Sequence, residues 1–362
     1  MKKYFYPIML TGIMLIIIAC KKNQEPILNN AIADANESSL ANANKVAYAP
    51  LTVVTIAGLS RQQGNVDGQG AKARFATPQD IKITDDGTIY ITDKLNNSIR
   101  KISTSNVVST VTIPNSATGQ SLKLPDQIVI SPDGTLNILA DVTYTDVTTH
   151  PFWIVSPNGQ VVAPLIKSTI LFSYHYLDLQ ADPYGKFLKI SGDRRFKENT
   201  AEHQAILEDF EVSRFVMGTN TYTPPVDSLT GEDKMLPAFG VIYCAYNGVK
   251  FIVVGNKHIY KLTPSGVFTL IYRDLDLMDV SSIIATRDTR TLYIVNRGKI
   301  ESIFNGKLSF LAGPNLNNNN VQGDGVGAKA DVIAYKLALS KDESTLYFTD
   351  QGRSTVRKIL LR

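Results

Sequence analysis

The four histidines of this 362-residue chain are the first candidates for catalysis or metal binding. They are His150, His175, His203 and His258, and no two of them stand at the close spacing of a metal-binding motif. His175 is the most suggestive, because it leads into an expected strand that also carries Asp178. A histidine that only satisfies local hydrogen bonds at the start of a strand explains the same pattern. The sequence therefore predicts no metal site.

Motifs for nucleophilic catalysis or phosphate binding are missing from the sequence. It holds no Gly-x-Ser-x-Gly and no Cys–His pair that would support an activated nucleophile. The glycine-rich segments 64–70 and 323–327 lack the Gly-Lys-Ser/Thr that opens a helix in a phosphate-binding loop. Both segments are therefore expected to be structural loops.

Four polar residues are the best candidates for ligand contacts. Asp93 and Asp350 each end an apolar strand-like run and are followed by a polar turn, which contains Asn96 in the first case. The alternative is that each Asp accepts backbone N–H groups of its own turn. Arg74, which precedes Phe75 on a loop expected on the same face, is the best single candidate for a polar contact. We predict ligand contacts at Arg74, Asp93, Asn96 and Asp350.

The elements that position these residues recur along the chain, which indicates a repeat architecture. The clearest unit covers residues 78–102, where apolar runs that alternate with period two are joined by the turn Asp85-Asp86-Gly87. It returns at 335–359, with Thr-x-Tyr-x-Thr-Asp and Arg-Lys-Ile shared by both copies. Arg100 and Arg357 in the second motif are expected to point outward or to pair with a neighbouring carboxylate. Weaker copies start near Asp126, Leu177, Gly240 and Ser282.

Six copies over residues 51–362 give about 52 residues each, slightly more than a usual propeller blade. The sequence therefore predicts an all-β, six-bladed β-propeller. The strand-like segment 52–57 precedes the first unit, and the last unit stops after its third strand. We expect this N-terminal strand to complete the last blade and close the ring. Residues 193–235 form the least regular region, with a charged insertion at 193–198 in the third blade.

The first and last units also resemble a known repeat family. The residues that carry the likeness are Val54-Thr55-Ile56-Ala57-Gly58, Asp67-Gly68-Gln69-Gly70-Ala71-Lys72-Ala73-Arg74-Phe75, and Phe310-Leu311-Ala312-Gly313 with Gly323-Asp324-Gly325-Val326-Gly327-Ala328-Lys329-Ala330. Together with the shared strand motifs, they look like NHL repeats. The likeness covers about a third of the chain, and the four middle units depart from it. It implies a six-bladed propeller that acts as a binding scaffold, and in a minority of relatives a metal-dependent lyase or lactonase.

The N-terminus reads as an export signal. Lys2 and Lys3 precede about 16 uncharged residues, too few for a membrane-spanning helix, which needs roughly 20. The run ends in Ile17-Ile18-Ala19-Cys20, which resembles a bacterial lipobox and implies cleavage before Cys20 and acylation of its thiol. Residues 1–19 are then a signal peptide, 20–50 a flexible lipid-anchored tether, and 51–362 the propeller. An uncleaved membrane anchor is the alternative.

The charge balance and the residues after Cys20 limit the kinds of partner and the membrane that we expect for this protein. Removing Lys2 and Lys3 from 37 basic residues leaves 35 against 33 acidic ones, so no basic footprint for nucleic acid is present. Lys21 and Lys22 lack the Asp that resembles an inner-membrane retention signal, which favours the outer membrane. The chain as a whole resembles an NHL-repeat lipoprotein of a Gram-negative, Bacteroidetes-like bacterium.

These observations predict a monomeric, lipid-anchored module of the cell envelope that binds a protein, peptide or glycan. No cofactor is expected for this function. The alternative is a metal-assisted lyase or lactonase-type hydrolase on the same propeller, for which Ca or Zn would be needed.

Overall fold

The structure is a computed structural model that describes residues 48–140, 149–162, 165–167, 178–181, 187–199, 204–216, 222–223, 236–237, 242–244, 247–254, 258–265, 267–273, 277 and 279–362. All of them belong to one compact unit, Tyr48–Arg362. The predicted signal peptide, Cys20 and the tether as far as residue 47 lie outside the described residues, as do His175 and His203. No helix within the described ranges is long and apolar enough to cross a membrane.

The two clearest repeats form matching antiparallel sheets. The first sheet has the order β2-β6-β5-β4-β3, with β2 (Gly68–Gln69), β3 (Pro78–Ile83), β4 (Ile89–Asp93), β5 (Ser98–Ile102) and β6 (Val107–Val111). The last sheet has the order β25-β1-β28-β27-β26, with β1 (Thr52–Ala57), β25 (Gly325–Val326), β26 (Ala334–Leu339), β27 (Thr345–Asp350) and β28 (Thr355–Leu360). Gly87 supports the turn between β3 and β4, because it has a φ of 84°.

Three of the middle units form further short-stranded sheets. The second contains β7 (Pro125–Ile130), β8 (Leu136–Ala140), β9 (Thr149–Val155), β10 (Val161–Val162) and β11 (Leu165–Lys167). The fourth contains β17 (Ile242–Cys244), β18 (Lys250–Val254), β19 (His258–Leu262) and β20 (Phe268–Arg273). The fifth contains β21 (Val280–Ala285), β22 (Thr291–Asn296), β23 (Lys299–Phe304) and β24 (Lys307–Ala312).

The third unit departs from this pattern. Its sheet contains β12 (Asp178–Ala181), β13 (Phe187–Asn199), β14 (Gln204–Val216), β15 (Tyr222–Thr223) and β16 (Leu236–Pro237). β13 and β14 are 13 residues each and pair along their length, because the charged segment 193–198 continues β13 instead of leaving the sheet. The expectation of a six-bladed propeller is therefore wrong. The described residues form five regular blades and one sheet built around a long hairpin.

The first strands of successive sheets contact one another. β3 contacts β7, β7 contacts β12, β12 contacts β17, β17 contacts β21, β21 contacts β26, and β26 contacts β3. This cyclic contact of inner strands, with meandering strands outside each of them, is a β-propeller. The prediction of an all-β propeller is thus confirmed.

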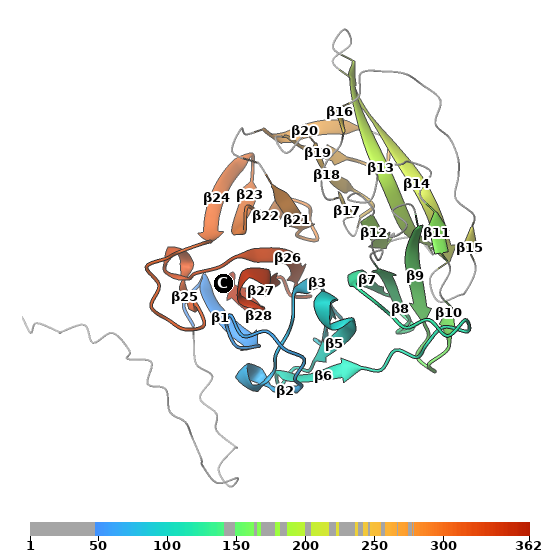
Figure 1. Cartoon of the computed structure of the whole chain (residues 1–362). Helices are drawn as coiled ribbons and strands as arrows, with labels where there is room; N and C mark the ends of the chain where they lie inside the picture. Colours follow the sequence, from blue (N-terminus) through green and yellow to red (C-terminus); the bar gives the residue numbers. More distant parts are fainter. Residues whose placement is uncertain are drawn as a thin grey trace, which may run out of the picture. The chain divides into compact units, whose positions relative to one another are not determined.

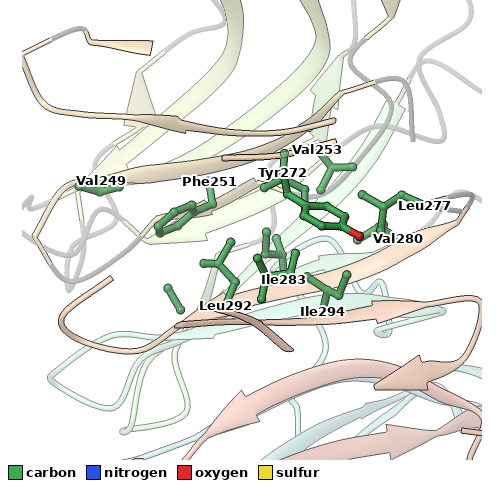
Figure 2. Close-up of a cluster of buried hydrophobic side chains, with 12 residues drawn as sticks. Val249, Phe251, Val253, Tyr272, Leu277, Val280, Ile283, Leu292 and Ile294 are labelled. Atoms are coloured by element: carbon green, nitrogen blue, oxygen red, sulfur yellow. The ribbon is translucent and has the colours of Figure 1, made fainter. Parts of the chain in front are cut away.

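The hydrophobic core lies between neighbouring sheets. Figure 2 shows the cluster between the fourth and fifth sheets, where Phe251 and Tyr272 pack against Ile283, Leu292 and Ile294. Equivalent clusters join the fifth sheet to the last, the last to the first, and the first to the second. Alternation along each strand supplies one buried face to each neighbour.

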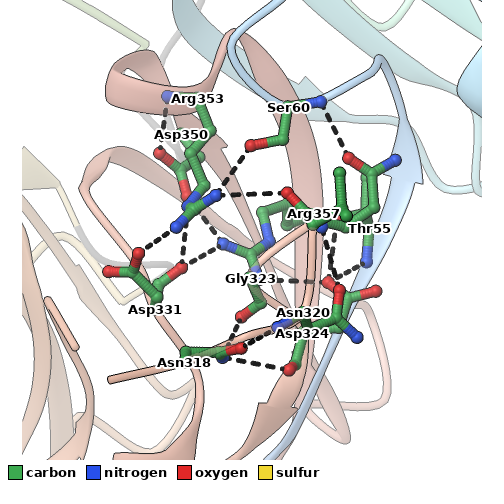
Figure 3. A network of polar contacts seen from close by, with 12 residues as sticks. Thr55, Ser60, Asn318, Asn320, Gly323, Asp324, Asp331, Asp350, Arg353 and Arg357 are labelled. Carbon is green, nitrogen blue, oxygen red and sulfur yellow. Dashed lines mark hydrogen bonds and ion pairs between the residues drawn. The ribbon is translucent and has the colours of Figure 1, made fainter. Parts of the chain in front are cut away.

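The N-terminal strand completes the last sheet. β1, blue in Figure 1, pairs antiparallel with the red β28, with Val53 opposite Ile359 and Thr55 opposite Arg357. Figure 3 shows the side-chain bonds of this closure, including Thr55 Oγ1, which donates to Asp324 Oδ1 at 2.8 Å. Gly58 leaves the strand with a φ of 91°, and a Cβ there would stand 2.8 Å from the Ser354 carbonyl oxygen. The pairing is the one expected for a closing strand.

Candidate functional site: a polar cluster on the inner strands

Two kinds of chain segment meet at one end of the inner strands. The register pairs Pro78 with Asp93 and Ala334 with Asp350, so each inner strand begins where the second strand ends. The 3-10 turns η2 (Lys94–Asn96) and η4 (Gln351–Arg353) follow those second strands. Side chains from the turns and from the starts of the inner strands therefore share one face of the propeller.

Five polar side chains meet at this face, and we call them the inner-strand cluster: Gln79, Lys94, Asp126, Tyr335 and Gln351. Gln79 is at its centre. Its Nε2 donates to Asp126 Oδ1 at 2.9 Å and to Tyr335 Oη at 3.1 Å. Its Oε1 accepts a hydrogen bond from Gln351 Nε2. The cluster thus joins three consecutive inner strands, β26, β3 and β7, through side chains.

An ion pair and a phenol set the electrostatics of the cluster. Lys94 Nζ lies 2.7 Å from Asp126 Oδ1, and the two side chains keep 19% and 27% of their surface exposed. Burial, followed by the nearby carboxylate of Asp126, raises the pKa of Tyr335 to about 12. The phenol therefore keeps its proton at every physiological pH and remains a hydrogen-bond donor.

The backbone beside the cluster is strained. Thr77 and Leu124 immediately precede β3 and β7, and their φ values are 64° and 44°. A positive φ is a genuine outlier for a β-branched residue such as Thr77. Such positions cost of the order of 1–3 kcal/mol each and concentrate at functional sites.

Asp93 lies beneath this face, inside the first sheet. Its side chain has no exposed surface; Oδ1 accepts from the Ala76 N–H, and Oδ2 accepts from Asn96 Nδ2 and Arg100 Nη1. Burial raises the pKa of its carboxyl, against the lowering effect of these hydrogen bonds. Asn96 also donates to the Gly64 carbonyl at 2.7 Å. Both residues fasten the turn and the neighbouring loop.

Asp350 repeats the arrangement in the last sheet. It is fully buried, caps η4 by accepting from the Arg353 N–H, and accepts from Arg357 Nη1 at 2.7 Å. Burial raises the pKa of this carboxyl, while Arg357 lowers it. Ligand contact through Asp93 or Asp350 stays a prediction, and their burial gives it no support.

The two buried arginines form matching clamps. Arg100 joins Asp93 to Asp67, and Arg357 joins Asp350 to Asp324. The guanidinium of Arg100 also lies over the Phe75 ring, 5.1 Å from its centroid. Of the two expectations for these arginines, pairing with a carboxylate is the one observed.

Arg74 belongs to the loop in front of β3. Its Nη1 donates to the carbonyls of Ala71 and Ala73, and its Nη2 donates to Gln62 Oε1 at 3.3 Å. The side chain is half-buried and is separate from the inner-strand cluster in its hydrogen bonds. Of the predicted site residues, the structure brings Asp93 and Asn96 into direct contact.

The remaining candidates are the glycine-rich segments and the histidines. In the glycine-rich segments, β2 and β25 pair with β6 and β1, as expected for structural loops. The ring of His258 lies 6.2 Å from that of Tyr260. Among the described residues, no three His, Cys, Asp or Glu side chains gather as a metal site would require.

No sequence motif identifies the inner-strand cluster, because its members are far apart in sequence. One signal was available: Pro78-Gln79-Asp80 and Pro125-Asp126-Gln127 put polar residues at the start of two inner strands whose remaining positions are mostly apolar. Buried Asp80 accepts from the Ile128 N–H at 3.0 Å, which shows that one of these residues links strands.

Comparison with known proteins places the fold. No known protein family and no curated protein matches the chain. A structural-genomics protein of unknown function from Bacteroides thetaiotaomicron is 18% identical with a TM-score of 0.56, over 85% of this chain and 75% of that one. An auxiliary nutrient binding protein from Bacteroides ovatus is 14% identical with a TM-score of 0.53, over 85% and 76%.

A virginiamycin B lyase from Staphylococcus aureus is also similar, with 13% identity and a TM-score of 0.45 over 86% of this chain and 98% of that one. That score is too low to support an argument about activity. At these identities, the likenesses to the two Bacteroides proteins show the fold alone, and the chain is similar to them as an all-β β-propeller.

Proposed function

We propose that this chain is a binding module of the cell envelope, whose ligand docks on the face where the inner strands begin. The observation that carries the proposal is the inner-strand cluster. It holds an ion pair, two amides and a protonated phenol, and all of these except the buried Gln79 are half-buried. A few convergent polar groups on a rigid scaffold are typical of a binding site.

The comparisons support a binding function without identifying the ligand. Similar propellers from Bacteroides include two auxiliary nutrient binding proteins, each with a TM-score of 0.53. The lipobox-like segment Ile17-Ile18-Ala19-Cys20 fits a role in the cell envelope. There the protein would capture a nutrient or assist another protein in doing so. We propose acylation at Cys20, a tether over residues 20–50 and an outer-membrane location on the same ground.

The NHL relationship is part of the proposal. It is supported by equivalent bonds in the first and last sheets. Thr110 Oγ1 donates to Asp67 in the first sheet as Thr55 Oγ1 does to Asp324 in the last. Gly70 donates its N–H to the carbonyl of Asn106, just before β6, and Gly327 donates its N–H to the carbonyl of Leu51, just before β1.

A thermal-shift screen of the full-length protein in detergent tests the function. The panel contains neutral oligosaccharides, acidic oligosaccharides and short peptides, with Ca²⁺ or Zn²⁺ added in parallel. One ligand class should raise the unfolding temperature, because a ligand at 100 times its Kd adds about 2.7 kcal/mol to the stability.

The variant Lys94→Ala should reduce the thermal shift, and Lys101→Ala on β5 is the matched control outside the cluster. An equal shift in both variants, or no shift with any class, would argue against binding at this face. Metal-dependent turnover of a panel compound would favour the lyase or hydrolase instead.

A further inference from the structure

The inner-strand cluster has hydrogen-bonding capacity that the described residues leave unused. Gln79 uses both ends of its amide on Asp126, Tyr335 and Gln351. Tyr335 Oη accepts from Gln79, but no described residue accepts the phenol proton. Within the same described residues, Asp126 Oδ2 and Gln351 Oε1 have no donor.

These unused groups lie on the more exposed members of the cluster. Gln79 is 8% exposed and is hydrogen-bonded to Asp126, Tyr335 and Gln351. The Asp126 side chain is 27% exposed, and Tyr335 and Gln351 are half-buried. One donor and two acceptors are therefore presented together at the face where the inner strands begin.

We propose that the inner-strand cluster binds the hydroxyl groups of a neutral carbohydrate. This inference rests on the proposed binding function and names its ligand class. A hydroxyl group both donates and accepts, so one sugar hydroxyl accepts from Tyr335 while it or its neighbour donates to Gln351 or Asp126. Adjacent hydroxyls on a sugar ring match a site that offers a donor beside two acceptors.

Charged ligands match the site less well. An ammonium ion only donates, so it would leave the phenol proton of Tyr335 without an acceptor. An anion would face the oxygens of Asp126 and Gln351, and the carboxylates of Asp126, Asp80 and Asp279 all act on Tyr335 to raise its pKa. Lys94 acts in the opposite direction and lowers the pKa of Tyr335, but it is already paired with Asp126.

A peptide is also a poorer match. Peptide recognition commonly uses an open strand edge, an apolar or aromatic-lined groove, a cluster of arginines, or backbone groups that hold a chain terminus. The five side chains of the inner-strand cluster provide none of these. They are amides, a carboxylate, an ammonium and a phenol, which bind through directed hydrogen bonds.

Calorimetric titration of the full-length protein tests the ligand class. The protein is kept in a detergent without a sugar headgroup, which would otherwise compete. The probes are neutral hexasaccharides of glucose, mannose, galactose and xylose, the anionic hexasaccharide of galacturonic acid, and a neutral hexapeptide. At least one neutral sugar should bind, and the anionic sugar and the peptide should not.

Two variants locate the site. Tyr335→Phe removes the phenol donor and Gln351→Ala removes an acceptor, and each should weaken binding about tenfold, the effect of one hydrogen bond. Tyr347→Phe, a half-buried tyrosine on β27 outside the cluster, is the matched control and should bind as the wild type does. Unfolding temperatures of the three variants show whether a loss of affinity comes from a loss of fold.

The outcomes separate this inference from the proposed function. Binding of the anionic sugar or the peptide, weakened by the same two variants, would overturn the carbohydrate assignment and leave binding at this face intact. Binding of a neutral sugar that neither variant weakens would overturn the site. No binding by any probe, together with a negative thermal-shift screen, would overturn both proposals.

Discussion

The buried arginines show how much a single residue contributes to this fold. Arg357 has no exposed surface, and it contacts Asp350, Asp324 and the Asp331 carbonyl. Its guanidinium fork serves several acceptors at once, which a lysine does not reproduce. Each blade of the repeat type thus has its own charged centre between the inner-strand face and the core.

Replacing Arg357 with Ala should lower the free energy of unfolding by about 3–5 kcal/mol, because it leaves buried Asp350 without its partner. Chemical denaturation measures the effect. Lys358→Ala, at the next and more exposed position of β28, is the matched control and should change stability by less than about 0.5 kcal/mol. Equal losses in the two variants would contradict the clamp.

Asp342 gives a prediction about pH. Hydrogen bonds from Ser340 and Ser344 in the turn between β26 and β27 lower the pKa of its carboxyl to about 2, below its ordinary value of 3.8. A carboxyl whose pKa is depressed by folding contributes stability above pH 4 and loses it as the pH falls towards 2.

NMR titration of the Asp342 carboxyl carbon should therefore find a midpoint near pH 2. The variant Asp342→Asn should show a smaller loss of stability between pH 4 and pH 2 than the wild type. A midpoint near pH 4 would show that the hydrogen bonds of this turn do not lower the pKa of Asp342.

The sequence predicted which polar residues lie at the ends of strands, but not which way their side chains point. Asp93 and Asp350 end their strands as expected, yet a carboxylate at a strand end reads the same whether it faces solvent or turns under the loop towards an arginine. Gln79, Asp126 and Tyr335 meet only because three inner strands converge. That proximity depends on the tertiary structure, and no local pattern encodes it.

At the scale of elements, the repeat was the strongest signal. Alternating runs and glycine turns predicted the inner strands, and β3, β7 and β26 begin within a residue or two of the expected positions. The third sheet was expected near Leu177, but its long hairpin was not predicted, because the charged run 193–198 is typical of a surface insertion. The sequence of this run does not decide between an insertion and a longer strand, and its backbone pairing with β14 shows the strand.

The likeness of β1 to β6 predicts equal effects of equivalent substitutions. Thr55→Val and Thr110→Val each remove one hydroxyl hydrogen bond to an aspartate, and each should cost about 1 kcal/mol. Denaturant unfolding of both variants checks this. A negligible cost at Thr55 beside a full cost at Thr110 would mean that β1 is only loosely part of the last sheet.

Deleting residues 51–58 should strongly lower the unfolding temperature, because it leaves β28 as an unpaired edge and removes the Thr55–Asp324 bonds. Differential scanning calorimetry makes the comparison. A synthetic peptide of residues 48–62, added to the deleted protein, should restore part of the loss. An unchanged melting curve after the deletion would show that closure does not depend on β1.

For the whole molecule, the prediction concerns the membrane anchor. Cys20→Ala should abolish acylation and leave a precursor that retains residues 1–19, because the lipid is placed before the signal is cut. Mass spectrometry and detergent phase partition distinguish the two forms. Normal processing and partition of the variant would falsify the lipoprotein proposal.

The pairing of β1 with β28 also has a consequence for biosynthesis. β1 is the first described strand to be made and β28 the last, so the final blade stays open until β28 has been synthesised. A chain truncated before β28 presents β1 as a bare edge, the kind of surface that aggregates or attracts proteases. Only a chain that extends through β28 can therefore close the last blade, and shorter chains keep the exposed edge.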